Sequence, residues 1–456
     1  MTFFHKLMAL MDGNRWEMKP YRVVAFAVLI SALSPWRGYG QDTPTESSAA
    51  QTSQDMTETA GPATTTAPPA SVAAPPGEAV ALETATAQEQ DNATKAPVDE
   101  TKKKKKKRKK VRVKARIHTR WIMEHHPDES GDSETTNEFN IRRARFKLLW
   151  EPEPWLMAKI QVGDFHKTDI FRRLLRDAYI HVSPLRFLEF RVGYFKKPFS
   201  RLALRSSGSL RVPERGIGND LILDSLLYGG RDLGFQLSGR LIQSIELDYA
   251  LGFFNGTGVT GEGRERDDQK DIVARLKVTP AKWLGLGVNG SFKFNTVAKT
   301  KTETNSNGKD ETVTRNENEM YFAAGADAVM KVAKVRLHLE GIVAQNHASG
   351  TVLTTRRELA DGEYPLILSL VSILSYKHKF DTAFKFAVEP VFMFEMLEPD
   401  LDINEDETFV FSPGFNSYFG KYFRVMIHGE FRRPRRNAKT LYPEKEMLYI
   451  QFCVDI

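Results

Sequence analysis

Cysteine is almost absent from this sequence of 456 residues, in which Cys453 stands alone. One cysteine excludes an internal disulfide, so the fold must be stable without such cross-links. Long hydrophobic stretches are also missing: after residue 33 no run of 18 uncharged apolar residues occurs. This absence excludes a bundle of membrane-spanning helices, each of which needs about 20 consecutive apolar residues. A membrane barrel is not excluded, because only every second residue of its strands must be apolar.

The sequence also lacks the motifs of common enzyme classes. No GxSxG, HExxH, P-loop or Rossmann signature is present. The neighbouring His125 and His126 would point to opposite faces of a strand, which disfavours a shared metal ion. We therefore expect no enzyme, no catalytic residue, no metal and no cofactor. A barrel hydrolase without a motif is the third-ranked alternative, and a serine-reactive probe would test it.

Residues 1–40 have the pattern of a signal peptide. Lys19 and Arg22 precede the apolar run Val23–Leu33, and small residues follow at the spacing that a signal peptidase reads. The run of 11 apolar residues is too short to span a bilayer. Met18 is a candidate for the true start, because residues 1–17 add nothing that a signal peptide needs. The alternative is a buried helix of a cytoplasmic protein.

Residues 41–101 are rich in Thr, Ala, Pro, Ser and Glu and predict a disordered linker, since they offer little apolar surface to bury. Lys102–Lys110 is an unbroken basic run, and Lys102–Arg120 holds thirteen Lys or Arg and no acid. Behind a signal peptide this run would lie in the periplasm. Anionic lipid head groups or an anionic envelope polymer are therefore its expected partners, and nucleic acid is not. The alternative is a simply solvated tail.

From residue 111 onward the chain reads as strands with alternating faces. In one of them Leu188, Phe190, Val192 and Tyr194 share one face, and mainly charged residues occupy the other. Sixteen such segments are predicted: Val111–His126, Glu138–Glu151, Trp155–His166, Leu174–Ser183, Phe187–Phe199, Arg231–Ile242, Ile245–Gly256, Asp271–Thr279, Trp283–Thr296, Met320–Val332, Val335–Asn346, Leu366–His378, Phe384–Leu397, Thr408–Gly420, Tyr422–Phe431 and Met447–Ile456.

The connections between these segments alternate between short and long. Short ones include 152–154, 183–184, 243–244, 280–282, 333–334 and 421, and long ones include 127–137, 200–230, 257–270, 297–319 and 348–365. This alternation predicts an all-β fold, a transmembrane antiparallel β-barrel of 16 strands over residues 111–456. An even strand count places both ends on the periplasmic side. A soluble sheet is the alternative, but the last strand alternates to the final residue, as outer-membrane barrels typically present it for assembly, although an ordinary edge strand could end in the same way.

Several segments resemble the phosphate-selective porin O and P family. They are IRRARFKLLW (141–150), LRDAYIHV (175–182), RVGYFKKPFS (191–200), PER (213–215), GGRDLGFQLSG (229–239) and YALGFFNGTG (249–258). The resemblance covers residues 141–286 and is specific in order and spacing. It implies a trimeric, 16-stranded outer-membrane porin that passes small anions through a channel lined with arginine and lysine.

Positive residues recur at spacing two on the faces opposite the apolar ones. An Arg or Lys facing lipid near the midplane costs about 2–4 kcal/mol, so these rows must face the lumen. There they attract anions, and arginine can give phosphate two parallel hydrogen bonds. The predicted pore-lining and anion-binding residues are Arg112, Lys114, Arg116, Arg143, Arg145, Lys147, Arg191, Lys197, Arg201, Arg205, Arg211, Arg215, Arg231, Arg275 and Lys277.

Acidic residues on inward positions are expected to neutralise about half of these cations by ion pairing. These acids are Asp177, Glu189, Asp232, Glu246, Asp248 and Glu340. Net anion preference then depends on the segment Ser200–Gly230, whose 31 residues are too many for a simple surface connection. Folded inward, its arginines would narrow the pore. Folded outward, they would meet the phosphates of lipopolysaccharide.

The sequence thus predicts a porin of a Gram-negative outer membrane for passive, anion-selective diffusion of small solutes such as phosphate or polyphosphate. Its expected partners are small anions, outer-membrane lipid and lipopolysaccharide, and two further copies of itself in a homotrimer. A second hypothesis is a structural anchor, in which the barrel holds the outer membrane to the envelope through Lys102–Lys110. Deleting residues 101–110 separates the two, because a porin should still conduct.

Overall fold

The computed structural model describes residues 111–127, 133–163, 174–256, 268–304, 310–347, 363–439 and 441–456. The predicted signal peptide, linker and basic run lie outside these residues. Within the described ranges, no helix combines the length and apolar character that crossing a membrane demands.

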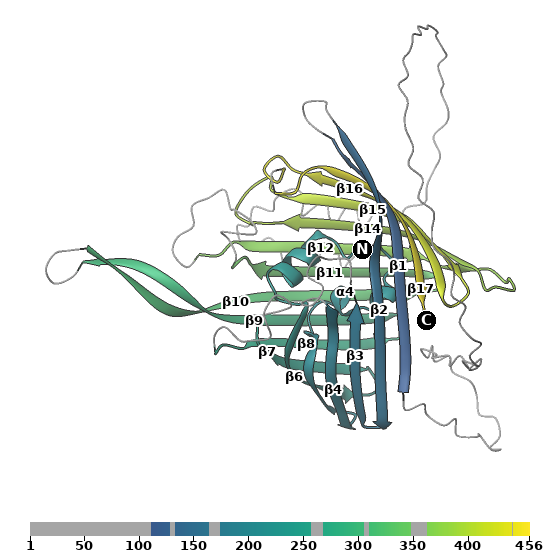
Figure 1. Ribbon diagram of the computed structural model, residues 1–456, viewed down its shortest axis with the longest axis horizontal. Helices are drawn as coiled ribbons and strands as arrows, with labels where there is room; N and C mark the ends of the chain where they lie inside the picture. The colour runs from purple at the N-terminus through teal and green to yellow at the C-terminus, as the bar shows by residue number, and fades with distance from the viewer. Residues whose placement is uncertain are drawn as a thin grey trace, which may run out of the picture. The chain divides into compact units, whose positions relative to one another are not determined.

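The described chain forms one antiparallel sheet that closes on itself (Figure 1). Each strand pairs with its sequence neighbours, and β1 closes the ring by pairing with both β2 and β17. β13 is a two-residue continuation of β12, because both pair with β14, so the seventeen segments make 16 barrel strands. The strands are β1 (Val111–His126), β2 (Glu134–Glu153), β3 (Leu156–Gly163), β4 (Leu175–Leu185), β5 (Leu188–Lys196), β6 (Arg231–Ile242), β7 (Leu247–Phe254), β8 (Asp271–Ala281), β9 (Leu284–Thr304), β10 (Asp310–Val332), β11 (Val335–Gln345), β12 (Leu366–Tyr376), β13 (His378–Lys379), β14 (Ala387–Glu398), β15 (Thr408–Phe419), β16 (Phe423–Pro434) and β17 (Lys445–Asp455).

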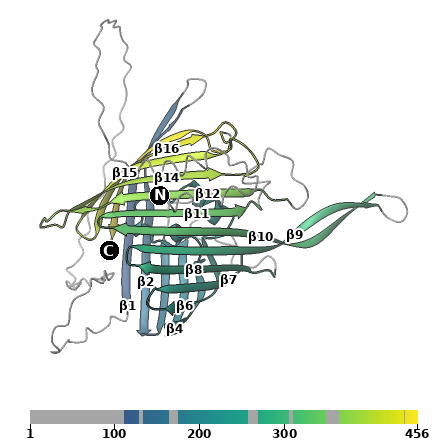
Figure 2. The ribbon, with the colours of Figure 1, turned by 180° about the vertical axis from the view of Figure 1, so that it is seen from behind.

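All sixteen predicted strands are confirmed, most of them within a few residues at each end. The prediction of a long loop over residues 297–319 is wrong, because β9 and β10 continue through it and pair as far as Thr304 and Asp310. This part of the two strands extends far beyond the rest of the barrel (Figures 1 and 2). It lacks the apolar alternation that marks a lipid-facing strand. Its threonines nevertheless suit a strand, and backbone pairing needs no apolar face.

The two faces of the strands differ in exposure as the alternation predicts. On β1, the apolar side chains of Val111, Val113 and Ile117 are about half exposed, at 50, 57 and 52%. His118, on the opposite face, is fully buried, and the inward Arg116 and Arg120 contact the segment between β5 and β6. The charged face of β1 is therefore the inner face.

The long segment between β5 and β6 is folded inside the barrel. Strand β5 ends at Lys196, where Pro198 removes a ladder donor and Ser200 adopts a positive φ of 61°. Four short helical turns follow: α4 (Arg201–Leu204), η1 (Ser207–Ser209), α5 (Ile217–Asn219) and η2 (Asp220–Ser225). Apolar residues of this segment, including Phe199, Ile222 and Tyr228, are fully buried against side chains of the inner wall. These contacts exclude the outward alternative. We call residues 197–230 the inner segment.

Candidate functional site

Two wall carboxylates hold the inner segment through its backbone rather than through its arginines. Glu340 of β11 accepts hydrogen bonds from the backbone N–H of Leu202 at 3.0 Å and from the hydroxyl of Ser200. Glu395 of β14 accepts from the backbone N–H groups of Ile217 at 3.0 Å and Gly218 at 2.7 Å. Each carboxylate thus satisfies free N–H groups at the start of a helical turn. The arginines of the inner segment are left for other contacts.

Nine of the fifteen predicted anion-binding residues form ion pairs with acids of the barrel or of the inner segment. The acids include Asp177, Asp232 and Asp248 from the expected set, whereas Glu340 pairs with none of the fifteen and bonds Ser200 and the backbone of Leu202, as above. The pairs are Arg112 with Glu151, Arg116 with Asp455, Arg143 with Glu214, Lys197 with Asp271 and Asp232, Arg201 and Arg275 with Asp327, Arg211 with Glu389, Arg231 with Asp177, and Lys277 with Asp248.

Three of these paired residues are enclosed. Arg143, Lys197 and Arg275 are only 2, 1 and 8% exposed. The Lys197 ammonium group lies 2.8 Å from Asp271 Oδ2 and 2.6 Å from the carbonyl oxygen of Leu227. Side chains enclosed in this way do not meet a passing solute. Sequence alternation placed them on the inward face, but the inner segment, which includes Lys197 itself, covers that face here.

Five predicted residues form no ion pair with a carboxylate in the described part of the chain. Lys114 and Lys147 lie opposite each other on β1 and β2. The guanidinium of Arg191 lies 4.9 Å from the ring centre of Tyr179 and 5.3 Å from that of Phe195. The remaining two are Arg205 and Arg215, and both belong to the inner segment.

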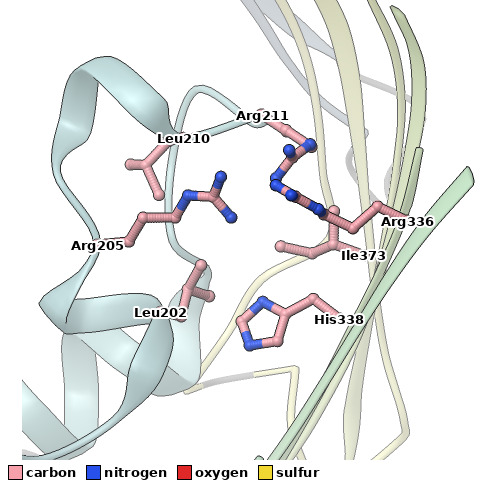
Figure 3. A pocket seen from close by; sticks show the side chains of 7 residues that line it. All are labelled: Leu202, Arg205, Leu210, Arg211, Arg336, His338 and Ile373. Carbon is pink, nitrogen blue, oxygen red and sulfur yellow. The ribbon is translucent and has the colours of Figure 1, made fainter. Parts of the chain in front are cut away.

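Arg205 contributes to a small cavity between the inner segment and the wall. Figure 3 shows the guanidinium groups of Arg205, Arg211 and Arg336 converging on this space, above the ring of His338. The aliphatic side chains of Leu202, Leu210 and Ile373 complete the lining. Burial, followed by the positive charges of Arg211 and Arg336, lowers the pKa of Arg205 to about 10. The guanidinium remains protonated at neutral pH, in a place where an anion would relieve the repulsion among three cations.

Arg336 was missed by the sequence prediction. It lies on β11 two residues before His338 and four before the inward-facing Glu340, so the period-2 rule would have placed it in the lumen.

Two further arginines, Arg116 and Arg145, converge on Ser207 in η1 of the inner segment. Arg116 of β1 and Arg145 of β2 are register partners, and their Nη1 atoms lie 2.7 and 3.0 Å from the hydroxyl oxygen of Ser207. Arg116 also donates to Ser206 at 3.3 Å. The serines were missed as well, because nothing in their sequence predicts contact with strands some 60 to 90 residues earlier. Among the described residues, no set of three or more His, Cys, Asp or Glu side chains is arranged to hold a metal.

Three solved structures are similar, each covering 76% of this chain: trimeric OmpT of Vibrio cholerae (11% identity, 99% of that chain, TM-score 0.48), an anion-selective porin from Comamonas acidovorans (10%, 99%, 0.48) and Salmonella typhi OmpF in complex with daunomycin (12%, 97%, 0.49). No curated protein sequence matches.

The model of the family described as phosphate-selective porin O and P matches residues 111–388, which is more than half of the chain. The match begins at the first residue of β1 and ends within β14, so it includes the whole inner segment. The chain therefore belongs to the phosphate-selective porin O and P family of outer-membrane β-barrel porins.

Proposed function

We propose that this porin is selective for anions and that the inner segment carries the selectivity. The observation that supports this proposal is the cavity on which the guanidinium groups of Arg205, Arg211 and Arg336 converge. Arg211 is paired there with Glu389, whereas Arg205 has no carboxylate partner in the described chain. Positive side chains in a narrow wet channel raise the local anion concentration, and incomplete contacts allow the ion to leave again.

The proposed solutes are phosphate and similar tetrahedral oxyanions. A guanidinium gives two parallel N–H donors that match two oxygens of one phosphate. The hydroxyl oxygen of Ser207 already accepts hydrogen bonds from Arg116 and Arg145, in the position that an anion oxygen would take. An anion that passes Ser207 would replace this hydroxyl as the acceptor of the two arginine hydrogen bonds. The proposed anion-contacting residues are Lys114, Arg116, Arg145, Lys147, Arg205, Arg211 and Arg336.

The assembly and orientation complete the proposal. We expect a homotrimer in the outer membrane, with lipid and lipopolysaccharide around it and both chain ends on the periplasmic side. This orientation follows from 16 strands and from the short turns at one end of the barrel.

The experiment is a reversal-potential measurement on single channels of the refolded barrel in a KCl gradient. Anion selectivity, together with a current blocked by millimolar or lower phosphate, is the expected result. Cation selectivity would contradict the proposal. A barrel without conductance would instead favour the anchor hypothesis.

A further inference from the structure

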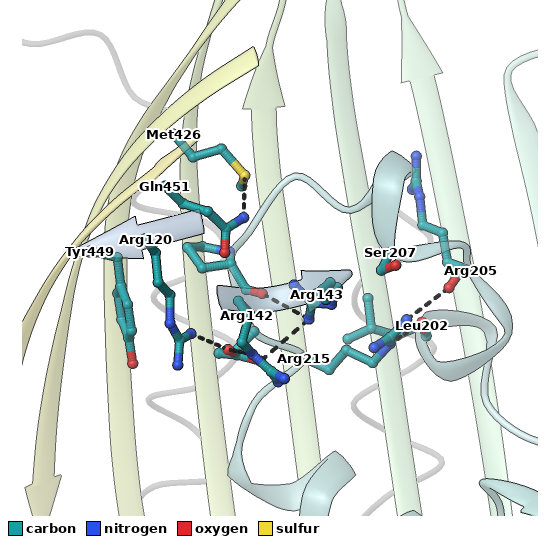
Figure 4. Close-up of polar contacts among 12 residues, drawn as sticks. Arg120, Arg142, Arg143, Leu202, Arg205, Ser207, Arg215, Met426, Tyr449 and Gln451 are labelled. Carbon is teal, nitrogen blue, oxygen red and sulfur yellow. Dashed lines mark hydrogen bonds and ion pairs between the residues drawn. The ribbon is translucent and has the colours of Figure 1, made fainter. Parts of the chain in front are cut away.

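Within the inner segment, the three residues Pro213, Glu214 and Arg215 connect the barrel wall to α4. We call them the PER segment. Glu214 contacts the wall: its Oε1 accepts from Arg120 Nη1 at 2.5 Å and from Arg142 Nε at 2.6 Å, and its Oε2 accepts from Arg142 Nη2 at 2.7 Å (Figure 4). Arg143 Nη2 lies 3.6 Å from Oε2 and donates to the carbonyl oxygen of Pro213 at 3.4 Å. One carboxylate thus gathers three arginines of β1 and β2.

Arg215, the next residue, contacts α4 and not the wall strands β1 and β2. Arg215 donates from Nε to the carbonyl oxygen of Leu202 at 3.1 Å and from Nη2 to that of Arg205 at 2.8 Å (Figure 4). Leu202 and Arg205 belong to α4 and its C-terminal cap. Arg215 therefore fixes the backbone from which the Arg205 side chain extends into the cavity. In the described residues, Arg205 itself has only one hydrogen bond from its side chain, to Ser209 at 3.4 Å.

Glu214 keeps its charge over the physiological pH range. Burial alone would raise the pKa of Glu214, but the contacts with Arg142, Arg143 and Arg120 outweigh it and hold the pKa well below its usual value. The PER segment is thus a permanent connection and not a pH-dependent one.

We propose that the PER segment positions the anion site, with Glu214 as the positioning residue that sets the location of Arg205. The inference rests on the proposed function for the identity of the solute, but not for the mechanical connection. Wall, PER segment and α4 form a continuous chain of charge-assisted hydrogen bonds, which are stronger than neutral ones. Without Glu214, the cavity would lose the fixed geometry that lets several guanidinium groups contact one ion.

A positional role and a purely electrostatic role of Glu214 predict opposite changes in anion affinity when its charge is removed. Glu214→Gln removes a negative charge from the lumen, so an electrostatic role predicts tighter binding of anions. A positional role predicts weaker binding, because the glutamine amide cannot hold three guanidinium groups. We expect the phosphate concentration for half block to rise about tenfold in E214Q, and the single-channel current in KCl alone to become noisier with brief closures.

Three further variants make the test decisive. Asp248→Asn is the matched control, since Asp248 also binds two cations, Arg240 at 2.7 Å and Lys277 at 2.9 Å, but on the wall away from the inner segment. It should leave the block and the current noise unchanged. Glu214→Asp keeps the charge and should restore part of the block. Arg215→Lys keeps the charge but loses the two-pronged contact, so it should weaken the block like E214Q.

Tighter phosphate block in E214Q, or a quiet and unchanged current in both E214Q and R215K, would overturn the inference. If E214Q does not refold, R215K decides, because it leaves no buried arginine without its partner. If phosphate fails to block even the unaltered channel, the proposed function is wrong, whereas the noise in KCl still tests the role of the PER segment.

Discussion

Positive residues at the start of the inner segment are ion-paired with the wall, whereas Arg205 in its middle is not paired within the described chain. Lys197 is enclosed between Asp271 and Asp232, and Arg201 lies 2.5 Å from the buried carboxylate of Asp327. Arg205, four residues later, has no carboxylate partner in the described chain and faces two other arginines across a cavity. The role of each cation is therefore decided by the wall strand opposite it. The paired Lys197 and Arg201 hold the segment in place, whereas Arg205 is available to a solute.

The largest effect is expected from breaking the enclosed pair at the start of the segment. Lys197→Met would leave Asp271 and Asp232 without their main cation at a site where both acids have no exposed surface. Removing one partner of a buried ion pair typically costs about 3–5 kcal/mol. We expect a loss of that size in the free energy of unfolding, measured by urea titration of the barrel in detergent or lipid.

The matched control for this prediction is Lys277→Met. Lys277 also pairs with an aspartate, but at a half-exposed position where an ion pair contributes about 1 kcal/mol or less. Equal losses in the two variants would contradict the stronger stabilising role that we assign to the enclosed pair.

The connection between β14 and β15 contains the opposite case, a buried acid, Asp406. Asp406 is 3% exposed, and no ion pair to it exists within the described residues. Burial, followed by the negative charges of Glu398 and Glu407, raises the pKa of Asp406 to about 7. The folded chain thus keeps a proton that the unfolded chain releases near pH 4. The stability from this proton is complete below pH 4 and is lost as the pH rises toward 7.

Asp406→Asn should remove this pH dependence. We expect the variant to be more stable than the unaltered barrel at pH 8 by on the order of 2 kcal/mol, and the difference to vanish near pH 4. Urea titrations at the two pH values measure both quantities. A variant that is less stable at pH 8 would show that Asp406 has a cationic partner there.

The fold was predictable from the sequence because lipid imposes a strict rule on every strand. Apolar residues at most second positions mark all sixteen strands, and the same rule assigns the inward face of β1. The rule does not apply beyond the bilayer. The extended ends of β9 and β10 are polar on both faces, so the same reading predicted a loop there.

The site was only partly predictable because its contacts join distant parts of the chain. Alternation gave the inward direction of Arg116, Arg145 and Glu340, but not that two of them meet at Ser207 or that the third accepts a backbone N–H. The PER letters mark Glu214 as part of a family motif without indicating that β1 and β2 supply its partners. Pairing across the lumen depends on how the inner segment folds, and no local pattern encodes that.

The sharpest test of the comparison replaces two arginines of the same inner segment, one in each of two variants. Arg205→Gln removes an unpaired cation, so we expect little change in stability but about a tenfold weaker phosphate block, which corresponds to about 1.4 kcal/mol. Arg201→Gln removes a paired cation whose charge is already neutralised by Asp327. It should lower stability and leave the block within about twofold, unless the inner segment itself becomes loose. Urea titration and single-channel block on the same two preparations separate these outcomes. If R201Q weakens the block as much as R205Q at unchanged stability, charge in the lumen acts collectively, and the distinction between paired and unpaired cations does not determine selectivity.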